Sequence, residues 1–273
     1  MTDTEPAPPL TYEQASRILA KLADLEHPVV LVGGQALNFW ASYYEDRVAE
    51  LAAAAPYTSK DIDFLGSHEA VKECARRLGG RARLTTLDDM NTPNTGIVVF
   101  LDDDGHLRQI DFLGSLAGIP ETYYESIEAT IVDEHDKPVA TLRVMDPISC
   151  LKGRAHNVAY LPGYDTEHAR NQLRAAIRCA KEFGRDLLKE DPFGALKSNE
   201  HVFDIARYGA GPFVYVRHAI DVLDAVVDDP GMPEKFYTER LPRIRTIIDR
   251  AREKVRAADA RAQALRARKE GGE

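Results

Sequence analysis

The sequence predicts an α+β protein, in which a mixed β-sheet flanked by helices is followed by an all-helical C-terminal domain. Short apolar strands alternate with helical segments up to about residue 160, and every periodic segment after Asp165 is helical. Two acidic strands are flanked by apolar residues, as the central strands of a sheet are. We therefore expect a disordered tail at residues 1–10, an α+β domain at residues 11–160 and a helical domain at residues 161–273.

The first helix is expected to begin at a capping box formed by Thr11 and Gln14, and to end at His27 and Pro28. The elements expected after it are, in chain order, a strand at residues 29–32, a tight turn at Gly33 and Gly34, an amphipathic helix at residues 35–46 with Phe39, Trp40 and Tyr43 in the core, an acidic strand at residues 59–65, a helix at residues 68–78, β-hairpins at residues 96–113 and 127–144, and a helix capped by Asp146 and Pro147.

Three aspartates lie on the two acidic strands. Asp61 and Asp63 belong to the run Ser-Lys-Asp-Ile-Asp-Phe-Leu, and Asp111 to the run Gln-Ile-Asp-Phe-Leu. Side chains alternate between the faces of a strand, so paired strands would bring the three carboxylates together. Close carboxylates repel one another unless a cation neutralises them, and hard oxygen ligands suit Mg²⁺ or Mn²⁺. The sequence predicts a metal site, with a solvated strand face as the alternative.

Two further motifs have weaker implications. The glycine pair Gly33-Gly34 follows an apolar strand and opens a helix, where backbone N–H groups can face a phosphate, although such a pair is usually only a turn. Neither a Rossmann fingerprint nor a Walker loop is present. The acidic turn at residues 102–105 is expected to be a solvated loop and not a second metal site.

Composition indicates an ordinary globular protein of a reducing cytoplasm. Its cysteines, Cys74, Cys150 and Cys179, have no C-x-x-C pairing, and no signal peptide or membrane-spanning apolar run is found. The net charge of -9 argues against non-specific coating of nucleic acid. Residues 240–269 nevertheless carry eleven Lys or Arg against three acids, which suits either an RNA partner or the solvated face of a long helix.

The glycine pair, the D-x-D run and the third acid together resemble the nucleotidyltransferase superfamily with the DNA polymerase β-like palm. The chain looks most like the AbiEii-type nucleotidyltransferase toxins and their uncharacterised relatives. The similar segments are Val-Gly-Gly-Gln-Ala-Leu at residues 32–37, Ser-Lys-Asp-Ile-Asp at residues 59–63 and Cys-Leu-Lys-Gly-Arg at residues 150–154. The resemblance covers about residues 25–160.

This resemblance implies metal-dependent transfer of NMP from an NTP to a hydroxyl acceptor, which is an RNA 3′ end, a protein or a small molecule. In the toxin version the acceptor is tRNA or protein, and an antitoxin protein is expected as a partner. Asp61 and Asp63 would bind two Mg²⁺ ions, and Asp111 would complete the site and help to activate the hydroxyl. The NTP would be held by Gly33 and Gly34, which cradle the triphosphate, and by Lys152 and Arg154, which neutralise its outer charge unless they form a solvated helix face.

Two other functions stay open. One is a non-catalytic palm-fold module that binds or regulates a partner through its helical half. The other is nucleotidylation of a small molecule of the antibiotic type, which predicts an acidic acceptor pocket. Three buried acids favour an enzyme over the non-catalytic module, because a retired site has no physical reason to keep carboxylates that destabilise the fold.

Overall fold

A computed structural model of the chain describes residues 7–55, 57–86, 88–89, 92–120, 124–133, 135 and 137–270. The chain forms two compact units, Met1–Gly153 and Arg154–Glu273. The first contains a mixed sheet with flanking helices and the second contains helices, so the predicted fold class is confirmed. The division falls inside a helix, seven residues before the boundary expected at residue 160. No helix in the described ranges has the length and apolarity needed to cross a membrane.

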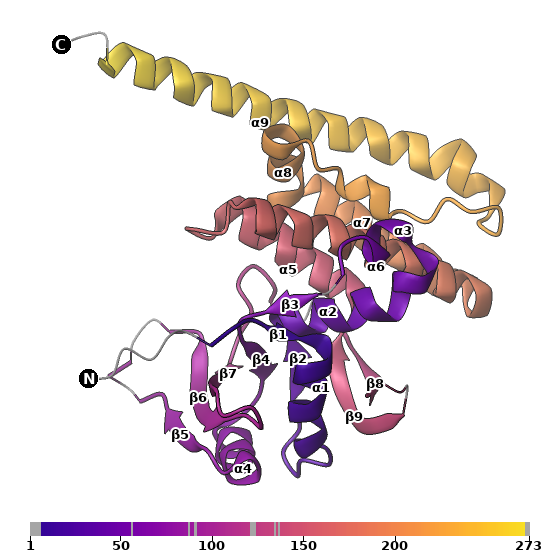
Figure 1. Cartoon of the computed structure of the whole chain (residues 1–273). Coiled ribbons are helices and arrows are strands. Elements are labelled where there is room, and N and C mark those ends of the chain that lie inside the picture. The colour runs from indigo at the N-terminus through magenta and orange to yellow at the C-terminus, as the bar shows by residue number, and fades with distance from the viewer. Residues whose placement is uncertain are drawn as a thin grey trace. The chain divides into compact units, whose positions relative to one another are not determined.

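A seven-stranded sheet organises the first unit (Figure 1), with the strand order β5-β6-β7-β4-β2-β9-β8. Both acidic strands, β7 and β4, lie inside it, as predicted, and they pair in parallel. The two predicted hairpins are the antiparallel pairs β6-β7 and β8-β9. The strands are β2 Val30–Val32, β4 Ile62–Leu65, β5 Arg81–Leu84, β6 Asn94–Leu101, β7 Leu107–Leu113, β8 Ser126–Val132 and β9 Pro138–Met145.

Helices flank this sheet: α1 packs against β8 and β9, α2 against β2 and β4, and α4 against β5 and β6. The capping box at Thr11 is confirmed, but α1 ends at Lys21 and not at His27, because Asp24 adopts a left-handed φ of 55°. The helices and short turns of this part are α1 Tyr12–Lys21, α2 Gly33–Tyr44, η1 Glu45–Arg47, α3 Ala49–Ala52, α4 His68–Leu78 and α5 Pro147–Tyr160, which continues into the second unit.

The expected disordered tail needs a correction at its end. Residues 1–6 lie outside the described residues, whereas Leu10 is 1% exposed and begins strand β1 (Leu10–Thr11), which pairs with β3 (Thr58–Ser59). Burying this leucine offsets the entropy of ordering the segment. The N-terminal strand therefore holds the residues that immediately precede the acidic strand.

Helix α2 was expected to be amphipathic but is buried on nearly all sides. Its glycines form the first residues of the helix and not a separate turn. The Trp40 indole N–H donates to the Met145 carbonyl at 2.8 Å, which fixes α2 to the end of β9. Phe39 and Trp40 are core residues as predicted, whereas Tyr43 is 54% exposed and was wrongly assigned to the core.

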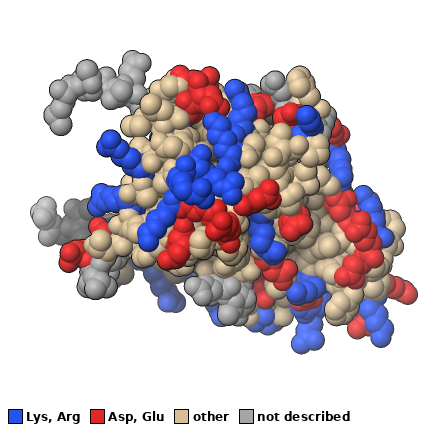
Figure 2. Space-filling view, turned by 90° about the horizontal axis from the view of Figure 1, so that it is seen from below, with Lys and Arg blue, Asp and Glu red and all other residues tan. Residues whose placement is uncertain are grey.

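The second unit consists of helices around an apolar core in which Phe203 and Phe236 stack with ring centroids 6.3 Å apart. Figure 2 draws the face of the molecule that is seen from below the view of Figure 1, and acidic and basic side chains are interspersed on that face. The elements of this unit after α5 are α6 Glu167–Glu190, α7 Pro192–Arg207, α8 Ala210–His218, η3 Val222–Ala225, the π-helical turn η4 Phe236–Arg240, and α9 Leu241–Glu270.

Candidate active site

The predicted pairing of the two acidic strands is present in the sheet. In the parallel ladder between β4 and β7, Asp63 is the direct partner of Asp111. Direct partners project to the same face of a sheet, and neighbouring strands lie about 4.8 Å apart. Phe64 and Phe112 occupy the other face, where their rings lie 5.6 Å apart and are fully buried. The alternation that puts these rings in the core therefore puts both carboxylates on the opposite, half-buried side.

Asp61 lies one residue before β4 and is exposed. Desolvation raises its pKa, and the negative charge of Asp111 raises it further, whereas Lys60 lowers it. Desolvation also raises the pKa of Asp111, against a hydrogen bond from the Gln109 amide at 2.9 Å. The two carboxylates therefore lie close enough to repel each other. Both would lose protons more readily beside a cation.

The glycine pair lies against this carboxylate face. Strand β2 is antiparallel to β4, with Val32 opposite Asp63, so that the next residue, Gly33, starts α2 beside the Asp63 side chain. Gly33 has a φ of +66°, and a Cβ on it would lie 2.0 Å from Asp63 Oδ2. A Cβ on Gly34 would lie 2.3 Å from Ser59 Oγ. Only glycine permits this approach of the helix start to the two side chains.

The start of α2 offers backbone donors to a ligand. Its N-cap residue, Val32, supplies no side-chain hydrogen bond to the first turn. The first N–H groups of a helix have no partner within the helix, and the macrodipole there favours negative charge. This arrangement suits a phosphate, although the adjacent Asp63 would repel one unless its charge were neutralised.

Lys152 and Arg154 were predicted to act together, and both lie on α5. Residues two apart on a helix project in nearly opposite directions, about 200° around the axis. The Arg154 guanidinium donates to the Gln172 side chain at 3.1 Å, within the helical unit. Lys152 is half-buried and belongs to the unit that contains the sheet. The two side chains cannot both approach one phosphate from the same face of α5.

Three polar groups near the site were not predicted as functional residues. Ser59 Oγ lies next to Gly34, and Gln109 binds Asp111. Gln35, in the first turn of α2, is 1% exposed, and its Oε1 accepts from Asn38 at 3.2 Å. Ser59 and Gln35 stand inside the segments that carry the family resemblance, so their position in those segments was the available signal.

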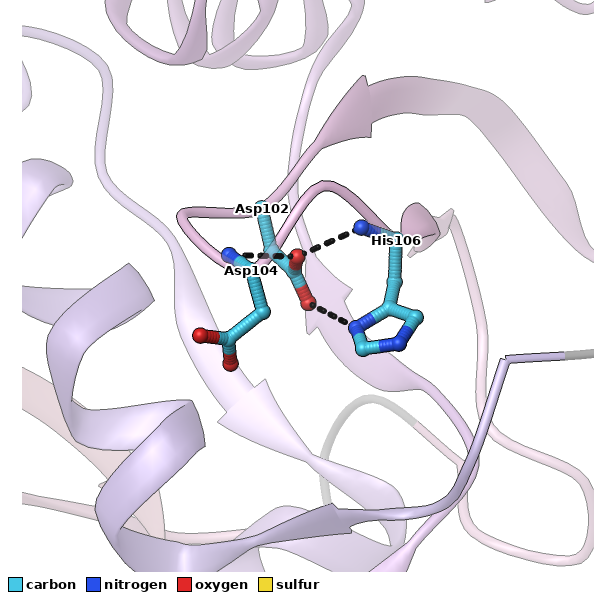
Figure 3. Close-up of side chains that lie close together, drawn as sticks. All are labelled: Asp102, Asp104 and His106. Atoms are coloured by element: carbon cyan, nitrogen blue, oxygen red, sulfur yellow. Dashed lines mark hydrogen bonds and ion pairs between the residues drawn. The ribbon is translucent and has the colours of Figure 1, made fainter.

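The acidic turn between β6 and β7 forms a second carboxylate cluster (Figure 3). Within the described ranges, the ligand atoms of Asp102, Asp104 and His106 all lie within 4.8 Å of one another. The carboxylates of Asp61, Asp63 and Asp111 do not meet this spacing. Asp102 is not solvated as expected: its side chain is 8% exposed.

Arg108 and two backbone amides already satisfy the Asp102 carboxylate. The Arg108 Nε donates to its Oδ2 at 2.7 Å, and the amides of Asp104 and His106 donate to its Oδ1 at 3.0 and 2.8 Å. Burial acts to raise the pKa of Asp102, but Arg108 and the His106 amide hold it below its usual range. The Asp102 carboxylate is therefore held in a structural ion pair, whereas the turn as a whole has the spacing of a possible metal site, so its assignment as a simple loop stays a prediction.

Comparison with known proteins gives no family assignment. No family model and no curated protein matches the chain. Among solved structures, it is similar to an antigenic nucleotidyltransferase-like protein from Paracoccidioides brasiliensis, with 10% identity, a TM-score of 0.42 and coverage of 70% of this chain and 95% of that one. It is also similar to the antibiotic-resistance factor ANT(2'')-Ia, with 15% identity, a TM-score of 0.38 and coverage of 70% and 96%. These likenesses are too distant to assign residues or chemistry.

Proposed function

We propose that the protein is a metal-dependent nucleotidyltransferase of the polymerase β-like superfamily, which transfers NMP from an NTP to a hydroxyl acceptor. The observation that carries the proposal is the direct pairing of Asp63 with Asp111 on parallel strands, with Gly33 at the start of α2 against the same carboxylate. This combination brings acidic oxygens and phosphate-binding backbone donors to one place.

The donor set fits a hard divalent cation. Asp63 and Asp111 supply carboxylate oxygens from paired strand positions, and Asp61 from the residue before β4. The pKa values of Asp61 and Asp111 are raised, and a bound cation would lower them. Mg²⁺ or Mn²⁺ bound there would neutralise charge on the triphosphate and on the leaving group. The same cation would remove the repulsion between Asp63 and a phosphate at the start of α2.

In the proposed reaction, the acceptor oxygen forms a bond to the α-phosphorus of the NTP. The bond from that phosphorus to the oxygen bridging to the β-phosphate breaks, and pyrophosphate leaves. The proton of the acceptor hydroxyl passes to a carboxylate of the site, and Asp111 is the candidate base. Gly33 and Gly34 hold the triphosphate at the start of α2, and Lys152 or Arg154 of α5 would neutralise its outer charge.

The proposal takes a narrower form for each class of acceptor that could receive the NMP. An RNA 3′ end, a protein side chain and a small molecule each offer the hydroxyl required. A toxin of the AbiEii type would use tRNA or protein and would be held inactive by an antitoxin. The competing function, a non-catalytic palm-fold module, is disfavoured because the carboxylates with raised pKa values lower the stability of the fold at neutral pH.

The test is transfer of label from each α-³²P NTP, with Mg²⁺ or Mn²⁺, to total cell RNA and protein. Asp63→Asn and Asp111→Asn keep the side-chain shape while removing the charge, and Asp104→Asn is the matched control because Asp104 is an exposed acid in the adjoining turn. We expect label with the wild type and Asp104→Asn, and loss of at least about 100-fold with either site variant. Absence of transfer together with absence of metal-dependent NTP binding would overturn the enzyme proposal and favour the binding module.

A further inference from the structure

Helix α9 carries a row of cations along the side opposite its packed face. Its buried side chains Ile244 and Ile248 recur every four residues and face the core of the helical unit. Arg243, Arg250, Lys254 and Arg261 are all exposed. Their spacings of seven, four and seven residues return to almost the same angle on a helix, because seven residues drift by only about 20°.

This row has no internal counter-charge. Within the residues that the structure describes, no hydrogen bond or ion pair is made by any of the four side chains. Other arginines of the same unit are paired: Arg240 with Glu200, and Arg217 with Asp259 of α9. On the face drawn in Figure 2, by contrast, acidic and basic side chains are interspersed.

The acids of α9 lie away from the row. Asp259 lies on the packed side and binds Arg217 at 2.8 Å, and Asp249 lies 3.5 Å from Arg252. At about 100° per residue, Glu253 lies roughly 80° around the helix from the row. These three acids therefore lie off the row, whose local charge is opposite in sign to the net charge of -9.

The row is also long and accessible. From Arg243 to Arg261 it covers about 27 Å at 1.5 Å per residue. The C-terminal part of α9 extends beyond α8 of the same unit (Figure 1), and residues 260–267 are exposed on all sides. A helix segment that is polar all round gains little from packing, so a role in contacting a partner is the better physical account of it.

We infer that this face of α9 is a docking surface for the phosphate backbone of a nucleic acid. Four unpaired cations in a line are complementary to a backbone that carries one charge per about 1.7 Å of duplex axis. The row has no aromatic side chains interleaved, so it would bind without reading bases. Binding of this kind would bring an RNA acceptor to the protein, but it stands independently of the proposed transfer reaction.

The test is fluorescence anisotropy with a labelled single-stranded RNA of mixed sequence, its duplex and the equivalent DNA. Measurements in EDTA without NTP separate this binding from transferase chemistry. The row variant is Arg250→Ala/Lys254→Ala/Arg261→Ala, which keeps a good helix former at each position. Its control removes the same charge from exposed positions of the other unit, with Lys72→Ala/Arg76→Ala/Arg81→Ala.

We expect wild type and control to bind alike. The row variant should lose about 2 from the slope of log K against log[salt] with single-stranded RNA, and about 100-fold in affinity at 0.1 M salt, because each phosphate contact contributes roughly 0.7 to that slope. Adding a cation to the row gives the reverse test. Ala257→Arg adds a cation within the row and should tighten binding, whereas Ala260→Arg adds the same charge about 100° away and should tighten it less.

Three results would overturn the inference. One is an equal loss in the control variant, which would show an effect of overall charge. Another is no binding of any nucleic acid at about 50 mM salt, where phosphate contacts are strongest. The third is row-dependent binding to anionic lipid vesicles in place of nucleic acid, which would assign the row to a membrane surface.

Discussion

Gly33→Ala tests the contact between the start of α2, which would bind phosphate, and the Asp63 carboxylate. The substitution forces a non-glycine residue to a φ of +66° and places its Cβ 2.0 Å from Asp63 Oδ2. The left-handed conformation costs about 1 to 2 kcal/mol, and relieving the overlap should cost a further 1 to 3 kcal/mol of the free energy of unfolding. A domain of ordinary stability survives such a loss, so the variant should fold and be measurable by urea unfolding.

Gly79→Ala supplies the matched control. Gly79 has a similar φ of +62°, at the end of α4, but a Cβ there would meet nothing within 4 Å. Gly79→Ala should therefore lose only the free energy of unfolding that the left-handed backbone costs. The difference in free energy of unfolding between the two variants then measures the overlap with Asp63. In the double variant Gly33→Ala/Asp63→Ala, much of that difference should return, as a coupling in a double-mutant cycle. Equal costs for Gly33→Ala and Gly79→Ala would refute the close approach of α2 to Asp63.

Other perturbations address charge and burial. Asp111→Asn should raise the free energy of unfolding at pH 7 in the absence of metal, because the raised pKa of Asp111 means that its negative charge destabilises the folded state there. Below pH 3.8 the carboxyl is protonated in both the folded and the unfolded state, so the gain should vanish, and urea midpoints measured against pH would test this. Arg108→Met should cost about 3 to 5 kcal/mol by removing the guanidinium that pairs with the buried Asp102 carboxylate, and a thermal shift smaller than about 2 °C would contradict this. Burial raises the pKa of Cys74 to about 12 and raises that of Cys179 as well, so mass spectrometry should find both unalkylated at pH 8 until the protein unfolds.

The central part of the fold was predictable because its signals are local. Alternation of apolar and acidic residues was enough to place β4 and β7 inside the sheet, and the hairpin turn at residues 102–105 fixed the register of β6 on β7. The cap at Asp146, whose Oδ1 accepts from the amides of Ile148 and Ser149, was also visible in the sequence. Each of these features depends on residues that are close together along the chain.

The features that were missed depend on distant residues. The sequence gives no sign that Gly33 touches Asp63, since the contact requires β2 to pair antiparallel with β4 in one register. The order of Leu10 likewise depends on its pairing with Ser59, and the exposure of Tyr43 on how α2 packs. Propensity and periodicity cannot supply such tertiary contacts.

Asp111 and Asp102, on and beside the same strand, show how the structure separates a candidate functional acid from a structural one. The Asp102 side chain is only 8% exposed, yet its pKa is lowered, because Arg108 and two backbone amides stabilise its charge. Asp111 accepts a hydrogen bond from the Gln109 side chain, and its pKa is raised because burial outweighs that bond. Spacing alone would select the Asp102 turn as the metal site, since its ligand atoms are closer together. Charge compensation favours Asp111, because a carboxylate with a raised pKa gains more from a nearby cation than one whose charge is already stabilised.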